Sequence, residues 1–233
     1  MMDTDAKSIE TVIFLFYMVI TWYGHACFKI QSGDTVLVVD PFAKEIGLTP
    51  PRFRADVVLV THAHADHANA AAIGGEPFLI SGPGEYEIKG INVLGLETFH
   101  DENGGRERGK NTIYRITVEG ITILHMGDFG EREVRDVTLE GIGDIGVLMI
   151  PVGGKYTIDG ERAEKIVRQI EPGFVIPMHY QLPGLKYGLD NVDAFLKEMG
   201  ASKGDAVDKL MIKEKDVAED KKTEVVVLKP VHA

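Results

Sequence analysis

Cysteine is almost absent from this sequence, since Cys27 is the only one among 233 residues. A single thiol cannot form an intrachain disulfide, and it cannot build a thiolate zinc site. A chain so poor in cysteine is typical of a reducing compartment, so we expect a cytoplasmic protein. We expect Cys27 itself to be a small residue of the core.

Positive charge is also scarce, because 25 lysines and arginines stand against 36 acidic residues, for a net charge of −11. Such a chain lacks the general basic surface that nucleic acids and anionic membranes attract. The apolar stretch "TVIFLFYMVITW" is shorter than the ~20 residues of a membrane-spanning helix, and acidic residues flank it where a signal peptide is basic. We therefore expect a small-molecule substrate as partner, no membrane and no nucleic acid, with homo-oligomers left open.

The domain organisation predicted from length is simple. A chain of 233 residues without repeats or linkers suits one domain spanning residues 1–233. We interpret residues 1–17 as an irregular leader before a buried strand. The patterned sequence begins at Met18, so either Met1 or Met18 could be the natural start.

Short apolar runs rich in valine and isoleucine dominate the first two thirds of the chain and predict β-strands. These runs are "CFKIQ", "VLVVD", "DVVLVTH", "PFLIS", "INVLGLE", "TIYRITV" and "ITILHM". "QSGDT" and "VEGIT" resemble hairpin turns. Two later runs, "IGVLMIPV" and "PGFVIPMHY", have the composition of strands buried on both faces.

Two segments between and after these later runs predict helices. "DGERAEKIVRQIEP" has apolar residues at helical spacing and ends at Pro172, and "DNVDAFLKEMG" is bounded by Asp190 and Gly200. Residues 203–222 are charged and predict a solvated loop between "KLMIK" and a last strand, "EVVVLKP". The first two thirds of the chain thus consist of strands, and the last third alternates strands and helices. This order predicts an α/β fold in which helices cover the outer face of the sheets.

Three of the eight histidines fall within the stretch "THAHADHANA" of residues 61–70, after a predicted strand. Residues two apart on an extended chain point the same way, so His62 and His64 can converge on one cation. Imidazole and carboxylate are ligands that zinc, iron and manganese accept. The cluster therefore indicates a metal site rather than a histidine-rich surface turn.

A helix is predicted directly after the histidine pair. "DHANAAAIGG" is rich in alanine and stops at Gly74 and Gly75, which places Asp66 and His67 in its first turn. Because these side chains are adjacent, they face a second position near the cation of His62 and His64. The junction between the strand and the predicted helix thus offers ligands to two neighbouring metals. Asp66 could also act only as the helix cap.

The order of motifs resembles that of the metallo-β-lactamase fold superfamily. "THAHADH" is similar to its T-H-x-H-x-D-H motif, and the other motifs follow in order: "VLVVDPF", "FHDENGGRERGKNTIYRI", "LHMGDFG" and "IPMHY". "WYGHACFKI" and "SGPGEYEIKGI" resemble the branch of ascorbate-6-phosphate lactonase and uncharacterised zinc-dependent hydrolases. The resemblance spans roughly residues 19–181.

The resemblance implies a four-layer αββα sandwich with two divalent metals at one edge, most simply Zn²⁺, with Mn²⁺ or Fe²⁺ as alternatives. The implied ligands are His62, His64 and His100 for the first metal, Asp66, His67 and His179 for the second, and Asp128 as the bridge. Flavodiiron-type relatives carry Glu at the position of His64, so that chemistry is not expected here.

The outer residues of this set have alternative interpretations. His100 could be a surface-loop histidine, and His125 could be the ligand in its place. Asp128 could be a turn aspartate, and His179 could be a buried core histidine. His125 ranks second to His100, because a strand position suits a buried, hydrogen-bonded histidine.

Two further residues near the motifs have no metal role implied. Asp40 precedes Pro41 and is expected to fix the cluster loop from behind the ligands. His25 either lines the active site or packs near Trp22.

Two metals ~3.5–4 Å apart can hold a bridging hydroxide, which attacks a carbonyl carbon or a phosphorus. Asp66 could accept the proton released during attack, with Asp128 as the next candidate. A phosphorylated or carboxylated substrate would need polar groups nearby. The candidates for such groups are Arg106, Arg108, Lys110, Asn111, Lys155 and Lys186.

Three functions therefore compete. The first is a metal-dependent, lactonase-like hydrolase that cleaves a small-molecule lactone, ester or phosphodiester. The second is an RNA-processing nuclease of the same superfamily, disfavoured by the acidic chain and the lack of a long basic insertion. The third is a non-catalytic member that only binds metal or a partner, disfavoured by the complete ligand set.

Overall fold

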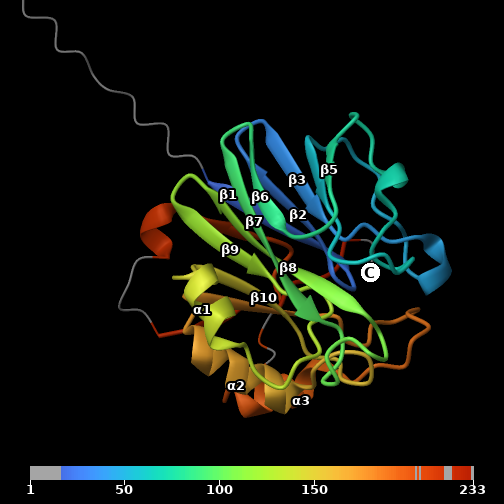
Figure 1. Cartoon of the computed structure of the whole chain (residues 1–233), viewed down its shortest axis with the longest axis vertical. Helices are drawn as coiled ribbons and strands as arrows, with labels where there is room; N and C mark the ends of the chain where they lie inside the picture. The colour runs from blue at the N-terminus through green and yellow to red at the C-terminus, as the bar shows by residue number, and fades with distance from the viewer. Residues whose placement is uncertain (1–16, 203, 205, 218–221, 232–233) are drawn as a thin grey trace, which may run out of the picture.

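A computed structural model describes residues 17–202, 204, 206–217 and 222–231 of the chain. Two mixed β-sheets lie face to face, and α-helices cover the second sheet, as Figure 1 shows. This arrangement confirms the predicted α/β class and the sandwich of the metallo-β-lactamase type. All of the predicted leader except Tyr17 lies outside the described residues.

The first sheet has the strand order β12-β1-β2-β3-β4-β5. Strands β1, β2 and β3 form antiparallel hairpins, and β3, β4 and β5 run parallel. Its strands are β1 (Met18–Gly24), β2 (Cys27–Ser32), β3 (Thr35–Val39), β4 (Val57–Leu59), β5 (Phe78–Ile80) and β12 (Leu210–Ile212). The parallel part places the ends of β3 and β4 at one edge.

The second sheet has the strand order β13-β11-β10-β9-β8-β7-β6. Strands β6 to β9 form an antiparallel meander, and β9, β10, β11 and β13 run parallel. Its strands are β6 (Gly84–Ile88), β7 (Ile91–Phe99), β8 (Lys110–Val118), β9 (Ile121–His125), β10 (Val147–Pro151), β11 (Phe174–Met178) and β13 (Glu224–Val225). Every residue of β10 is buried, as its continuous apolar run predicts.

The core lies between the sheets and follows from the alternation of the strands. In β1, Met18, Ile20 and Trp22 are fully buried, while the residues between them are partly exposed. The Trp22 ring packs 6.3 Å from Phe28 and 5.1 Å from Tyr180 between ring centroids. Cys27 is fully buried beside them, as predicted. This packing anchors the turn that follows β1.

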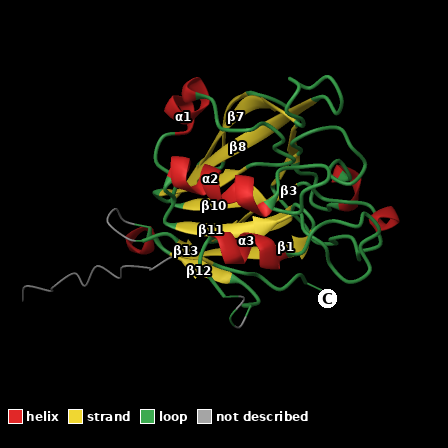
Figure 2. Ribbon diagram, turned by 90° about the horizontal axis from the view of Figure 1, so that it is seen from below, coloured by secondary structure: helices red, strands yellow, loops and turns green. Residues whose placement is uncertain are grey.

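The α-helices all follow the meander in the chain: α1 (Asp136–Ile142), α2 (Gly160–Ile170) and α3 (Val192–Glu198). Figure 2 shows α2 and α3 lying along the second sheet. The Asp159 side chain caps α2 by accepting a bond from the Arg162 N–H at 2.9 Å. The helices at α2 and α3 were predicted, whereas α1 was not. None of the helices in the described part of the chain has the length and apolar character of a membrane span.

The predicted helix after the histidine cluster is wrong. Residues 62–69 form bends and turns, and only the short 3-10 helix η2 (Ala70–Ala72) follows them. The Asn69 N–H bonds the Pro41 carbonyl at 2.8 Å, and its side-chain amide bonds the Phe42 carbonyl at 3.0 Å. These bonds to a neighbouring loop replace the helical ones, so tertiary contacts override alanine's propensity.

The last strand is also shorter than predicted. "EVVVLKP" forms β13 only at Glu224 and Val225. Beyond them the Val226 N–H still bonds the Val175 carbonyl of β11 at 2.9 Å, and Leu228 forms an isolated bridge with Val207. The predicted loop of residues 203–222 contains strand β12, which falls within the run "KLMIK", and the short 3-10 helix η3 (Glu214–Asp216). Part of this segment lies outside the described residues.

Candidate metal centre

The candidate site lies at one edge of the sandwich, where strands from both sheets end. Loops that follow β4 and β7 carry the histidine cluster and His100, and loops that follow β9 and β11 carry Asp128 and His179. The carboxyl ends of parallel strands are a common place for ligand sites in open α/β sheets. The structure therefore brings all seven predicted ligand residues together.

The three residues predicted for the first metal form one group. Ligand atoms of His62, His64 and His100 lie within 4.8 Å of one another. His62 and His64 lie in the bend after β4 rather than on the strand itself, so their convergence comes from the bend. His100 is 2% exposed, whereas His64 is exposed. The predicted alternative that His100 is a surface residue is wrong.

The three residues predicted for the second metal form another group. Ligand atoms of Asp66, His67 and His179 lie within 4.8 Å of one another, and His25 belongs to the same group. His67 and His179 are buried, and Asp66 is partly buried with 18% of its side chain exposed. The sequence left open whether His25 lines the site or packs near Trp22, and the structure shows both. Its side chain belongs to the second ligand group, and its carbonyl accepts a bond from the Trp22 indole N–H at 3.0 Å.

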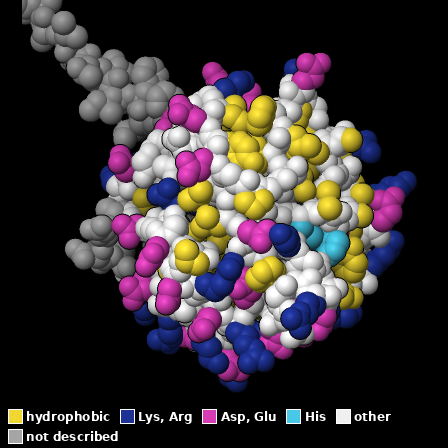
Figure 3. Space-filling model, viewed as in Figure 1, with side chains coloured by type: hydrophobic (Ala, Val, Ile, Leu, Met, Phe, Trp, Pro, Cys, Tyr) yellow, Lys and Arg dark blue, Asp and Glu magenta, His cyan; other side chains and the backbone are white. Residues whose placement is uncertain are grey.

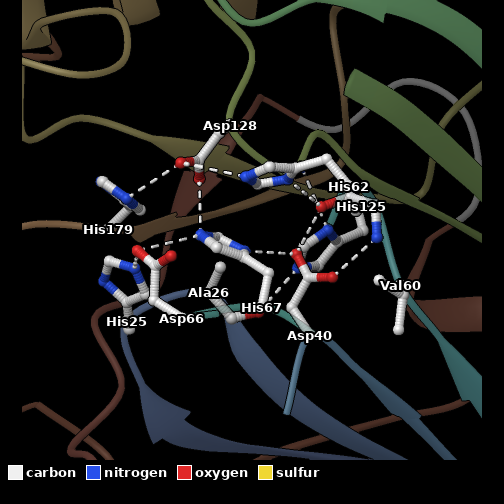
Figure 4. Close-up of polar contacts among 12 residues, drawn as sticks. His25, Ala26, Asp40, Val60, His62, Asp66, His67, His125, Asp128 and His179 are labelled. Atoms are coloured by element: carbon white, nitrogen blue, oxygen red, sulfur yellow. Dashed lines mark hydrogen bonds and ion pairs between the residues drawn. The ribbon is translucent and has the colours of Figure 1, made fainter. Parts of the chain in front are cut away.

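Asp128 contacts members of both groups, and Figure 4 shows it between His179 and His62. Its Oδ2 is 3.1 Å from His100 Nε2, 3.3 Å from His179 Nε2 and 3.9 Å from His62 Nε2. Its Oδ1 is 3.2 Å from His67 Nε2. One buried carboxylate thus contacts histidines from both groups, which is the position that a bridging ligand needs.

Asp40 holds the cluster loop from behind. Its carboxylate accepts bonds from the Thr61 N–H and the Thr61 hydroxyl, both at 2.8 Å, and lies 2.8 Å from His67 Nδ1. An ionised carboxylate only accepts, so His67 Nδ1 carries a proton toward Asp40 and leaves Nε2 as the ring atom that faces the site. The structure gives Asp40 the supporting role that the sequence predicted.

Asn111 and His125 lie behind the site, and their side chains bond to the fold rather than facing the ligand groups. The Asn111 side chain accepts from the Asp128 N–H at 3.0 Å and donates to the Met126 carbonyl at 2.9 Å, so it shapes the Asp128 turn instead of facing substrate. His125 Nε2 lies 2.9 Å from the Ala26 carbonyl, and its Nδ1 accepts from the Gly127 N–H. Both ring nitrogens of His125 are therefore occupied within the fold.

The charges of the cluster are tightly coupled. Burial alone would raise the pKa of Asp128, but the neighbouring His179 and His67 hold it well below its usual range. Burial lowers the pKa of His62 to about 3 and that of His25 to about 4. For His67 the opposing charge of Asp128 outweighs burial and raises its pKa well above its usual value. The lowered pKa values of His62 and His25 keep these two imidazoles neutral at neutral pH, the state that metal ligation requires, whereas the raised pKa of His67 means that a metal ion there must displace a proton.

Buried atoms without hydrogen-bond partners test whether the residues suit metal ions. Among the described residues, the ring nitrogens His62 Nε2 and His67 Nε2 and the oxygen Asp128 Oδ1 are buried and lack a well-aligned hydrogen bond. Buried polar atoms are normally paired, and leaving them unpaired costs about 1–3 kcal/mol each. Neutral imidazoles and ionised carboxylates are the donors that divalent metals bind, so the residues fit such ions.

Basic and aromatic side chains lie beside the centre. The Arg108 guanidinium lies 5.6 Å from the Tyr156 ring centroid, and the Lys155 ammonium lies 4.9 Å from the same ring. The Tyr156 ring is 6.0 Å from the Tyr187 ring, which is 5.6 Å from the His25 ring. Figure 3 shows histidine side chains reaching the surface with basic and acidic side chains beside them.

The other predicted substrate-binding groups are placed differently. Lys110 pairs with Glu97 at 2.7 Å, and Arg106 and Lys186 are exposed. The sequence missed Tyr187, which lies beside Asp66. Burial, followed by the charge of Asp66, raises the pKa of Tyr187 to about 12, so its hydroxyl keeps its proton.

Comparison with known proteins identifies the family. A family model described as the beta-lactamase superfamily domain matches residues 19–179. The chain belongs to this superfamily. It is 30% identical over 203 residues to a UPF0173 metal-dependent hydrolase of Methanoculleus marisnigri, a match that covers 74% of this chain and 86% of the relative. A Thermoplasma acidophilum hydrolase of the same name is 30% identical over 189 residues, covering 69% and 82%.

Solved structures also resemble this metallo-β-lactamase superfamily member over most of its length. A candidate zinc-dependent hydrolase of the superfamily from Thermotoga maritima is 35% identical, with a TM-score of 0.71, covering 91% of this chain and 100% of that one. An isothiocyanate hydrolase from Delia radicum gut bacteria, 13% identical with a TM-score of 0.62, shares the fold alone over 91% of this chain and 97% of that one. The chain is thus a metal-dependent hydrolase by family.

Proposed function

We propose that this protein is a dinuclear metal-dependent hydrolase that cleaves a small-molecule lactone, ester or phosphodiester. The observation that carries the proposal is Asp128, a buried carboxylate within 3.9 Å of four histidines from two ligand groups. Two bound divalent ions would supply an activated water and a Lewis acid for the electrophile's oxygen. Zn²⁺ is the first choice of ion, because imidazoles dominate the donor set.

The first ion would be held by His62, His64 and His100, and the second by Asp66, His67 and His179, with Asp128 shared. Asp66 has a second proposed role as proton acceptor for the attacking water, and Asp128 is the next candidate. Burial would raise the pKa of Asp66, but the hydrogen bond from His25 and the charge of His67 lower it below its usual range. Asp66 is therefore ionised at neutral pH, which both a metal ligand and a proton acceptor require.

Arg108 and Lys155 support a substrate that carries an anionic group. Arg108 is partly buried on the loop after His100, and the backbone N–H of Arg108 is fixed by Asp101 at 2.8 Å. Guanidinium and ammonium groups beside an aromatic ring suit a carboxylate or a phosphate. Together with the single cysteine, these features fit a cytoplasmic enzyme of small-molecule metabolism.

The test is metal analysis of the purified chain, followed by a screen of lactones, thioesters and phosphodiesters with Zn²⁺, Mn²⁺ or Fe²⁺ restored. Asp66→Asn keeps the shape of the side chain but cannot take a proton. We expect it to retain a substantial share of the metal and to lose most turnover, with both measured on one preparation. Near-normal turnover with full metal would assign the base to another residue, Asp128 first.

A further inference from the structure

His25 occupies a turn that the fold holds in a strained conformation. It follows β1, is fully buried, and has a φ of 53°, a left-handed value that side chains other than glycine rarely adopt. Its carbonyl accepts two bonds, one from the Trp22 indole N–H and one from the His179 backbone N–H, both at 3.0 Å. The backbone of His25 is therefore tied both to the core and to a proposed ligand of the second metal.

The His25 side chain contacts the second ligand group as well. Its Nε2 lies 3.1 Å from Asp66 Oδ2, and its ring centroid is 4.1 Å from that of His179 and 5.0 Å from that of His67. Asp66, as an ionised carboxylate, can only accept, so His25 Nε2 donates. Figure 4 shows His25 and Asp66 facing each other beside His67.

Packing alone does not explain a histidine at this position. Its Nδ1 is buried and has no hydrogen-bond partner among the described residues, and an unpaired buried polar atom is destabilising. An apolar side chain would fill the same space without that penalty. The contact that only a donor can make is the one with Asp66.

We propose that His25 is a positioning residue for the second metal ion, fixing the Asp66 carboxylate relative to His67 and His179. The inference rests on the proposed dinuclear function and extends it to a residue outside the seven ligands. Partners that orient metal ligands typically change metal affinity by about 10–100-fold when they are removed. Tyr187 also lies beside Asp66, so removal of His25 leaves this carboxylate with one neighbouring polar side chain.

The test is a titration of chelator-treated, full-length protein with Zn²⁺ in competition with a chromophoric chelator. We expect His25→Ala to weaken one of two Zn²⁺ sites about 10–100-fold and to leave the other unchanged. His25→Gln, which keeps an N–H donor, should recover most of that loss. In an Asp66→Ala background the same His25→Ala change should have no further effect, because its target is gone.

His125→Gln is the matched control, since His125 is equally buried and bonds Ala26, the next residue in the same turn. It should lower the melting temperature without changing either Zn²⁺ affinity. Unchanged affinity in His25→Ala, with two Zn²⁺ bound by the unmodified chain, overturns the role of His25 alone. A loss that Gln does not rescue, or that persists without Asp66, makes His25 a direct ligand and also overturns the proposal. Binding of only one Zn²⁺ by the unmodified chain would contradict both the dinuclear function and the role of His25.

Discussion

Gly153 offers a steric test of the second metal site. It follows β10, and a Cβ placed on it would lie 2.1 Å from the carbonyl oxygen of His179. Ordinary contact begins at 3.4 Å, so in Gly153→Ala the two backbones must separate by about 1.3 Å. Neighbouring Tyr180 Cα at 3.1 Å restricts escape on one side. Metal–ligand distances normally lie within about 0.2 Å of their standard values, so a shift of about 1.3 Å should take His179 out of the ion's reach.

The expected result for Gly153→Ala is a folded chain that retains one tightly bound Zn²⁺, because His62, His64 and His100 belong to another loop system. Overpacking of this kind typically destabilises by about 1–3 kcal/mol. Zn²⁺ stoichiometry and urea unfolding measure the two effects. Gly74→Ala is the control, since the nearest atom to its Cβ would be 3.6 Å away. Two Zn²⁺ of unchanged affinity in Gly153→Ala would refute the assignment of His179 as a ligand.

Three further predictions concern the ions and their ligands. Metal analysis at saturation should give about two ions per chain, and Asp128→Ala should lose at least one; one tight ion in the unmodified chain would contradict this. His100→Ala should remove metal and activity, whereas His125→Ala should retain metal and lose roughly 1–3 kcal/mol in denaturant unfolding; the reverse pattern would exchange their roles. Below pH ~6.5 unfolded His62 takes up a proton that the folded residue, with its pKa lowered to about 3, does not. The raised pKa of His67 adds a stability that stays constant over this pH range. The free energy of unfolding of the metal-free protein should therefore fall by about 1.4 kcal/mol per pH unit for each histidine with a lowered pKa, as pH falls from 6.5 to 4.5. A free energy of unfolding that stays flat or rises over this range would contradict this.

The sequence predicts best where function and structure are local. The stretch containing His62, His64, Asp66 and His67 is contiguous, so its chemistry is visible without a fold. The contact between His25 and Asp66 joins residues 41 positions apart, and only the packing of two loops creates it. Asn111 was expected near the substrate because its type suits that role. Its burial and its bonds to Asp128 and Met126 could be found only in the structure.

The same distinction explains the error after the cluster. Alanine-rich sequence predicts a helix because propensity is a local property. In the fold, Asn69 bonds the loop that follows Asp40, and Asp40 in turn holds Thr61 and His67. The segment is therefore shaped by a loop about 27 residues earlier in the chain. A regular helix would give up these bonds and with them the support of the ligand loop.

Metal removal should loosen the contact between the two sheets, because both proposed ions take ligands from both. The first sheet supplies the loop of His62 to His67, and the second supplies His100 and His179. An ion that binds only the folded chain stabilises it by about 4 kcal/mol at a thousand times its Kd. We expect the melting temperature to fall after chelation and to rise again with added Zn²⁺ in a concentration-dependent way. Equal melting temperatures with and without Zn²⁺ would mean that the ions do not bridge the sheets. Only Asp40 and Asp128 would then hold the histidines together. That arrangement is less stable, because it leaves the buried Nε2 atoms of His62 and His67 without a well-aligned hydrogen bond.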